Sequence, residues 1–346
     1  MANLDLLGRL PYSWNRSLQI TDRVRGDSTG MGERVYVGVD LGGTAIKVGL
    51  CDEQGKLLQT YEGPTGTEHG AEVVLENIAQ YVRKLVDESP YEWEQVAGIG
   101  AGIAGFMDIP EGFIKLSPNL GWRNVPVKKI LEEKLGKTVK IDNDANVAAL
   151  GEAWSGAGAG IPNVVCYTLG TGVGGGVIIH GRIYQGYNGM AGELGHMVVV
   201  PDLEAIECGC GKKGCLETVS SATGIIRMAK EAVERGEHTS LALVENIMAK
   251  DVFDAAKTGD ETALRIINRA ALYLGKSMAA ISVVLNPQRF IVGGGVSKAG
   301  EILFDAIRKY YNEHAQETAK EGVDIVPAVL GNDAGVVGAA GLNLHS

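Results

Sequence analysis

Apolar and polar residues follow one another along this chain in two patterns, short apolar runs and longer amphipathic stretches. Residues 35–39 form an apolar run typical of a buried strand, and a Gly-Gly-Thr turn separates it from a second β-rich run over residues 45–50. Between residues 68 and 88, apolar side chains recur at helical spacing with charges between them, which predicts a helix with one face in the core. This alternation predicts an α/β fold.

The same alternation continues to the end of the sequence. Further strands are predicted over residues 96–106, 139–141, 163–169, 177–179, 289–292 and 324–330. Further helices are predicted through Ala148 and Trp154, over residues 264–285 and over residues 334–344.

These elements are interpreted as two α/β domains. The first covers residues 33–142 and is completed by residues 332–346, and the larger one covers residues 143–331. The strand over residues 324–330 and the helix after it are expected to pack back on the first domain. Residues 1–32 have a mixed, Gly- and Arg-rich composition. They are interpreted as a flexible leader or a cloning remnant, with Met31 as a plausible natural start, and a natural regulatory arm is the alternative.

Composition narrows the class of protein. The 346 residues, 45% of them hydrophobic and 21% charged, are enough for two domains with cores of their own. A net charge of −10 argues against a nucleic-acid surface. No apolar run is long enough to span a bilayer, so we expect a soluble, cytoplasmic protein.

Residues 193–217 hold the most specific chemical signal. They contain one histidine and three cysteines among several glycines, namely His196, Cys208, Cys210 and Cys215. Three sulfurs and one imidazole suit tetrahedral Zn²⁺, and four protein ligands make a closed, structural site. The alternative is free thiols or a disulfide, which is the weaker reading for a chain of cytosolic character.

Two glutamates flank these four residues. Glu193 lies three residues before His196, and Glu217 lies two residues after Cys215. Ordering the metal knuckle therefore also fixes two carboxylates. Because carboxylates accept hydrogen bonds from hydroxyl groups, a rigid pair is suited to binding a polyol.

Three glycine patches and one acidic patch follow predicted strands. They are Asp40 with Gly42, Gly43 and Thr44; Asp142, Asn143 and Asp144; residues 170–176; and Gly293, Gly294 and Gly295. Backbone N–H groups in such turns can hold phosphate, and bare glycine lets a flat purine approach. Each patch alone has an ordinary explanation, a plain hairpin for the glycines and an N-cap for the aspartates. All of them in this order weaken that explanation.

These residues together carry a resemblance. The glycine patches, with Lys47, resemble the two phosphate motifs and the adenosine motif of the actin-like ATPase superfamily. The glutamates, histidine and cysteines of residues 193–217 resemble the signature of the ROK family (repressors, open reading frames and kinases). Within that family the chain is most similar to the bacterial ATP-dependent glucokinases. The resemblance implies two α/β domains around a cleft, an ATP- and Mg²⁺-dependent transfer of phosphate to glucose, a step in glycolysis, and a structural Zn²⁺.

The resemblance also implies roles for individual residues. Asp144 would be the catalytic base. The sugar would be bound by Asn119, Asn143, Asp144, Glu193, His196 and Glu217. The nucleotide and its Mg²⁺ would be bound by Asp40, Gly42, Gly43, Thr44, Lys47, Gly170, Thr171, Gly172, Gly293, Gly294 and Gly295. Zn²⁺ would be held by His196, Cys208, Cys210 and Cys215. A homodimer or homotetramer is expected.

Two alternatives stay open within the same family. One is a kinase for another hexose, such as N-acetylmannosamine or fructose, with ATP or polyphosphate as donor. The other, from a different class, is a sugar-responsive transcriptional repressor. Residues 1–32 are too short for a complete helix-turn-helix module, and the acidic charge disfavours DNA binding.

Overall fold

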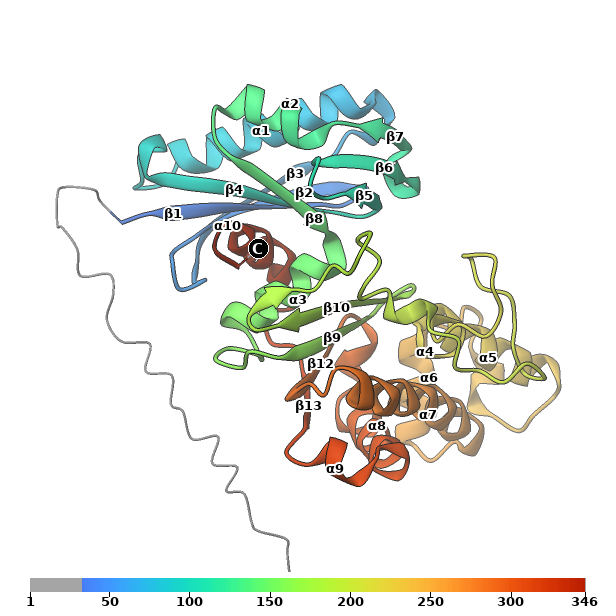
Figure 1. Cartoon of the computed structure of the whole chain (residues 1–346). Coiled ribbons are helices and arrows are strands. Elements are labelled where there is room, and N and C mark those ends of the chain that lie inside the picture. The colour runs from blue at the N-terminus through green and yellow to red at the C-terminus, as the bar shows by residue number, and fades with distance from the viewer. Residues whose placement is uncertain (1–32, 346) are drawn as a thin grey trace, which may run out of the picture. The chain divides into compact units, whose positions relative to one another are not determined.

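The structure, a computed structural model, describes residues 33–345. The leader expected over residues 1–32 lies outside the described residues. Within residues 33–345, two five-stranded sheets are each covered by helices, with a separate three-stranded sheet beside the first (Figure 1). The predicted α/β class is confirmed. Over the same residues, no helix has both the length and the apolar character needed to cross a membrane.

The first sheet has the strand order β3-β2-β1-β4-β8. Its strands are β1 (Val35–Leu41), β2 (Ala45–Cys51), β3 (Leu57–Pro64), β4 (Val96–Ile103) and β8 (Val139–Asn143). The first three pair antiparallel, whereas β1, β4 and β8 run parallel. Helices α1 (Ala71–Asp87) and α2 (Val127–Leu135) bury their apolar sides on one face. The three-stranded sheet contains β5 (Phe106–Asp108), β6 (Phe113–Ser117) and β7 (Trp122–Val125).

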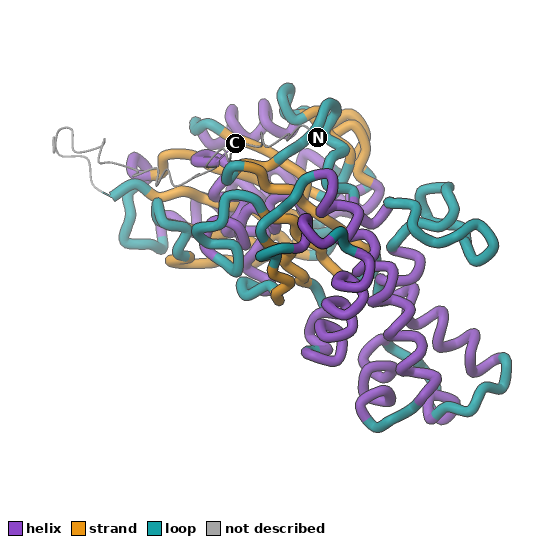
Figure 2. The backbone as a smooth tube through the Cα atoms, turned by 60° about the horizontal axis from the view of Figure 1, so that its bottom comes forward, coloured by secondary structure: helices purple, strands orange, loops and turns teal. Residues whose placement is uncertain are grey.

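The second sheet repeats this plan with the order β11-β10-β9-β12-β13. Its strands are β9 (Val164–Leu169), β10 (Val173–Ile179), β11 (Arg182–Ile183), β12 (Arg289–Gly293) and β13 (Asp324–Pro327). Each pair runs in the same sense as its counterpart in the first sheet. The helices of this half are α4 (Glu217–Ser220), α5 (Ala222–Glu234), α6 (Ala249–Lys257), α7 (Glu261–Val284), α8 (Glu301–His314) and α9 (Glu317–Lys320). In Figure 2 helices gather beyond the strands at one end of the molecule.

Two helices lie between the sheets and are exchanged between the halves (Figure 1). Helix α3 (Asp144–Ser155) follows β8 of the first sheet but packs on β10 of the second. Helix α10 (Ala334–His345) follows β13 but packs on β1 and β4. The approach is close, because a Cβ at Gly100 would lie 1.8 Å from the carbonyl oxygen of Ala339. Helix α10 therefore packs against the first half, as predicted.

Two element predictions need correction. Strand β13 pairs with β12 in the second sheet, whereas it was expected to pack on the first domain. Strand β10 begins at Val173, so three of the glycines predicted to form a turn lie within a strand. They are glycines because other elements press on them: a Cβ at Gly176 would lie 2.4 Å from the Ala149 side chain of α3.

Candidate active site

Four carboxylates face one cavity of about 440 Å³ at the edge where both sheets and both exchanged helices meet. They are Asp40, Asp144, Glu193 and Glu217. Asp40 stands near the end of β1, Asp144 begins α3, Glu193 precedes the short 3-10 helix Leu194–His196, and Glu217 begins α4. The structure therefore brings together acidic residues that are up to 177 positions apart in sequence (217 − 40).

The first two carboxylates meet because parallel strands end at one edge of a sheet. Asp40 is level with Gly102 of β4, which is level with Asp142 of β8. Helix α3 starts two residues after Asp142. A ligand site at the carboxyl ends of parallel strands is the usual place in an open α/β sheet.

The environment of the cavity raises the pKa of three of these carboxyl groups. Burial raises the pKa of Asp40 to about 6, and the nearby charge of Asp144 acts in the same direction. Burial likewise raises the pKa of Asp144. For Glu193 burial is again the main cause of a raised pKa, opposed by His196. Carboxylates crowded in this way favour ligands that bring hydroxyl donors or cations.

In the acidic patch at the start of α3, the N-cap is not the residue that the sequence suggests. The pattern favours an aspartate as N-cap, whereas the structure has Asn143 in that position. Its side-chain oxygen accepts hydrogen bonds from the backbone N–H of Ala145, at 2.9 Å, and of Asn146, at 3.4 Å. Asn143 has the extended backbone that an N-cap needs, whereas Asp144 is already helical. The Asp144 carboxylate is thereby left to face the cavity.

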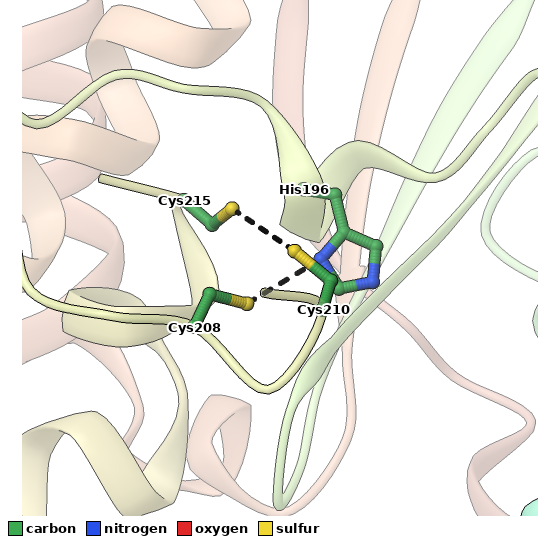
Figure 3. A group of neighbouring side chains, drawn as sticks. All are labelled: His196, Cys208, Cys210 and Cys215. Carbon is green, nitrogen blue, oxygen red and sulfur yellow. Dashed lines mark hydrogen bonds between the residues drawn. The ribbon is translucent and has the colours of Figure 1, made fainter. Parts of the chain in front are cut away.

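The histidine and the three cysteines converge as predicted. Their ligand atoms all lie within 4.8 Å of one another, and Figure 3 shows the four side chains pointing toward a common centre. Cys208 Sγ lies 3.7 Å from His196 Nδ1, and Cys210 Sγ lies 3.7 Å from Cys215 Sγ. Bonds of about 2.0–2.3 Å in a tetrahedron place ligand atoms roughly 3.5–3.8 Å apart, so the donor set and its spacing fit Zn²⁺.

The metal cluster borders the cavity through Glu217. Its Oε1 atom accepts a hydrogen bond from Cys208 Sγ at 2.9 Å and lies 3.7 Å from His196 Nδ1. Its Oε2 atom accepts a hydrogen bond from the backbone N–H of Val173 at 3.4 Å. Because His196 turns Nδ1 toward the cluster, its Nε2 atom points elsewhere. The position of the Glu217 carboxylate therefore depends on the geometry of the histidine–cysteine cluster.

A second cavity, of about 550 Å³, joins two of the glycine patches. Gly170 and Thr171 line it on one side and Gly295 on another. Apolar side chains of α5 and α6 complete the wall, among them Ile226 and Phe253. Gly170 also lines the first cavity, so the turn between β9 and β10 separates an acidic cavity from a largely apolar one.

Residues 36–345 match the profile of the ROK family. The chain belongs to the ROK family. The glucokinase of Halalkalibacterium halodurans is 45% identical over 89% of this chain and 94% of that protein. The glucokinase of Thermotoga maritima is 41% identical over 88% and 96%. Among solved structures, a ROK family glucokinase from Streptomyces griseus in complex with glucose and AMPPNP is 37% identical, with a TM-score of 0.71, over 89% of this chain and 98% of that one.

The remaining predicted residues of this ROK protein do not line the first cavity. Asn119 lies next to the first glycine turn, since a Cβ at Gly43 would be 3.7 Å from its carbonyl oxygen. Gly42 and Thr44 belong to that turn, and their carbonyl oxygens accept hydrogen bonds from the hydroxyl and the backbone N–H of Thr65. Gly293 ends β12, and Gly294 adopts a φ of 86° beside Leu169 in a turn that no other residue type enters easily.

Lys47 has a partner that the sequence did not suggest. Its Nζ atom forms an ion pair with Asp333 and donates a hydrogen bond to the carbonyl oxygen of Asn332 at 3.3 Å. The residues around this contact, Gly331 and Asn332, line the first cavity. Lys47 therefore holds the segment that leads into α10, and a contact with a nucleotide would require it to leave Asp333.

The sequence marks Asp142 as part of the acidic patch but does not reveal its partner, Gln185. Asp142 is fully buried and accepts hydrogen bonds from Asn146 and Gln185. Gln185 stands in a polar loop where nothing in the sequence marks it. The polar residues at the start of α3 are evident in the sequence. Their partner Gln185 belongs to the loop after β11, in the second half.

Proposed function

We propose that this ROK protein is an ATP-dependent glucokinase, which transfers the γ-phosphoryl group of ATP to the 6-hydroxyl of glucose. The observation that carries the proposal is the single cavity that holds Asp144, Glu193 and Glu217 next to the glycine turn at Gly170. Identity of 41–45% with two glucokinases, over nearly their whole length, supports the same activity.

Asp144 acts as the general base in this proposal. Phosphoryl transfer needs a group that orients the acceptor hydroxyl and takes its proton as the oxygen attacks phosphorus. Burial raises the pKa of Asp144, which makes its carboxylate a stronger base. Because Asn143 caps the helix, the Asp144 side chain is not engaged as a cap.

The sugar is bound by the acidic wall of the cavity. Glu193 and Glu217 accept hydrogen bonds from ring hydroxyls, and the Asn143 amide donates one. His196 contributes its Nε2 atom while Nδ1 faces the metal cluster. Asn119, near the first turn, and His196 do not line the cavity, so both would contact the sugar from its border.

The phosphates lie between the two glycine turns. Backbone N–H groups at Gly43, Thr44 and Thr171 would donate to their oxygens, and Asp40 would hold the accompanying cation. Mg²⁺ supplies neutralisation of the charge on the phosphates when it is bound. The base of the nucleotide occupies the second cavity, where Gly295 leaves space for a flat ring.

Zn²⁺ at the four-residue cluster has a structural role in this proposal. The cluster supplies four protein ligands and no open position, which is typical of structural zinc. Ordering Cys208 and Cys215 fixes Glu217 and the segment after Glu193. The protein is further proposed to act as a homodimer or homotetramer, which light scattering on the purified chain tests.

A coupled assay of ADP release tests the proposal. Glucose, mannose, fructose, N-acetylglucosamine and N-acetylmannosamine are offered with ATP, and polyphosphate replaces ATP in a second series. We expect the highest kcat/KM for glucose with ATP. Higher kcat/KM for an N-acetylated sugar would assign a different kinase, and absence of turnover with every pair would end the proposal.

A further inference from the structure

A hydrogen-bond network behind the cavity joins the two halves of the protein. Its centre is Asp142, the penultimate residue of β8, which has no exposed surface. Oδ1 accepts hydrogen bonds from the backbone N–H of Asn143, at 2.7 Å, and from Nδ2 of Asn146, at 2.9 Å. Oδ2 accepts one from Nε2 of Gln185 at 2.6 Å. A buried carboxylate without such donors would be strongly destabilising.

Gln185 reaches Asp142 from the other sheet. It follows β11 and opens the loop 184–192, which ends immediately before Glu193. The carbonyl oxygen of Gln185 accepts a hydrogen bond from the N–H of Ala191 at 3.2 Å, which closes the loop into a ring. The far side of this loop lies against the first half, since a Cβ at Gly189 would be 3.8 Å from the carbonyl oxygen of Met107.

Asn146 completes the connection. Its Nδ2 atom binds Asp142, and its Oδ1 atom lies against Gly192, where a Cβ would be only 3.2 Å away. Gly192 also has a φ of 94°, a conformation that side chains other than glycine rarely adopt. The residue before Glu193 therefore packs closely against Asn146, and the start of its loop is hydrogen-bonded to Asp142 through Gln185. Both bonds end on the carboxylate that precedes Asp144 by two positions.

We infer that Gln185 is a positioning residue that sets the distance between Glu193 and Asp144, and so determines how tightly the sugar is held. Glu193 comes from the second half and Asp144 from the start of a helix anchored in the first. The hydrogen bond from the Gln185 amide to Asp142 links the loop that leads to Glu193 with the strand end that leads to Asp144. The inference rests on the proposed function, in which both carboxylates contact the sugar.

An exchange of donor and acceptor tests the inference. Gln185→Glu replaces the amide by a carboxyl group of the same shape, so that Asp142 loses the amide N–H donor and faces a second acidic group instead. We expect the KM for glucose to rise about tenfold, with the KM for ATP within twofold of wild type. Adding Asp142→Asn restores one donor and one acceptor with the total charge unchanged. The double variant Asp142→Asn/Gln185→Glu should return to within about threefold of the wild-type glucose KM.

A matched control separates positioning from general stability. Gln80→Glu makes the same chemical change on the exposed side of α1, and both KM values should stay at the wild-type level. A thermal melt of every variant accompanies the kinetics. If Gln185→Glu lowers the melting temperature but leaves the glucose KM unchanged, the residue has only a structural role and the inference is wrong. Failure of the double variant to recover would also overturn it.

The outcomes distinguish this inference from the proposed function. A wild-type enzyme that phosphorylates glucose, together with a Gln185→Glu variant of unchanged glucose KM, overturns the positioning role alone. A wild-type enzyme that turns over no hexose overturns both.

Discussion

The two β-hairpins that open the sheets, β1–β2 and β9–β10, have the same place in the fold and different chemistry. In the strand register of the first hairpin, Asp40 lies opposite Lys47. At the corresponding position of the second hairpin, Thr168 lies opposite Gly174. Four residues separate the paired Leu41 and Ile46, but only three separate Leu169 and Val173. At these positions the first hairpin carries an acidic and a basic side chain, and the second carries only a hydroxyl group and a glycine.

The difference follows from what each hairpin faces. The charge of Asp144 helps to raise the pKa of Asp40, so the first hairpin contributes an acidic group to the cavity. The second hairpin is pressed between α3 and the metal-cluster side, where Val173 binds Glu217 and Gly174 approaches Ala145. In the proposed function, a repeated backbone therefore gives two different halves of a site: an acidic group for a cation on one side and backbone donors on the other.

The largest effect is expected from removing the base rather than from either hairpin. Asp144→Asn keeps the shape of the side chain and its helix position but cannot accept a proton. We expect kcat to fall about a hundredfold or more, with a modest change in sugar affinity. Asp87→Asn, on the exposed end of α1, is the control and should keep full turnover. Near wild-type kcat in Asp144→Asn would shift the role of base to another carboxylate, Asp40 first.

The charged hairpin should also depend on pH in a way that the other does not. The pKa of Asp40 is about 6 in the folded protein against 3.8 unfolded, so the folded state binds its proton more tightly. The stabilisation this gives is fully present below the unfolded pKa and is lost as pH rises through 6. The stability of Asp40→Asn relative to wild type should therefore rise by on the order of 2 kcal/mol between pH 4.5 and pH 8.

Urea unfolding of the ligand-free protein at pH 4.5, 6 and 8 measures this difference. The control is Thr168→Ser at the corresponding position of the second hairpin, which adds no ionisable group. Its stability relative to wild type should be the same at all three pH values. If the Asp40→Asn difference were also independent of pH, burial of a charge at Asp40 would not be the cause.

The second hairpin depends on the metal cluster through Glu217. Cys210→Ser removes one of four ligands, and we expect bound zinc to fall well below one ion per chain. Glu217 should then lose its fixed position, so that the KM for glucose rises about tenfold while the KM for ATP changes little. Elemental analysis and steady-state kinetics measure both effects. Cys166→Ala, a buried cysteine outside the cluster, should keep its zinc. Less than one zinc per two chains in the wild type would contradict the structural site.

What the sequence predicts here is what lies close together along the chain. The four cluster residues span only 20 positions, and their residue types select the metal, so the spacing alone is informative. The glycine turns are likewise local, so a short stretch of sequence is enough to predict a turn without knowing the fold. Strand ends and helix faces follow from short periodic patterns.

Contacts between distant segments were not predictable in the same way. Lys47 and Asp333 are 286 positions apart. Gln185 and Asp142 are 43 apart, the first in the loop after β11 and the second in β8. Strand β13 reads equally well as a partner for either sheet, because an apolar run does not specify its neighbour. The sequence predicts a turn for the glycines of β10. Glycine occurs both in turns and in strands that a helix approaches closely, so the residue type alone does not distinguish the two.

The smallest and most direct test compares one glycine from each turn. A Cβ at Gly172 would lie 2.6 Å from Oε2 of Glu217, whereas a Cβ at Gly43 meets nothing closer than 3.7 Å. Gly172→Ala should therefore displace the Glu217 carboxylate and raise the KM for glucose about fivefold. Gly43→Ala should leave the glucose KM unchanged, and any effect should fall on ATP. Steady-state kinetics with each substrate varied in turn decide this, and equal glucose KM values for the two variants would mean that the second turn, like the first, acts on the nucleotide alone.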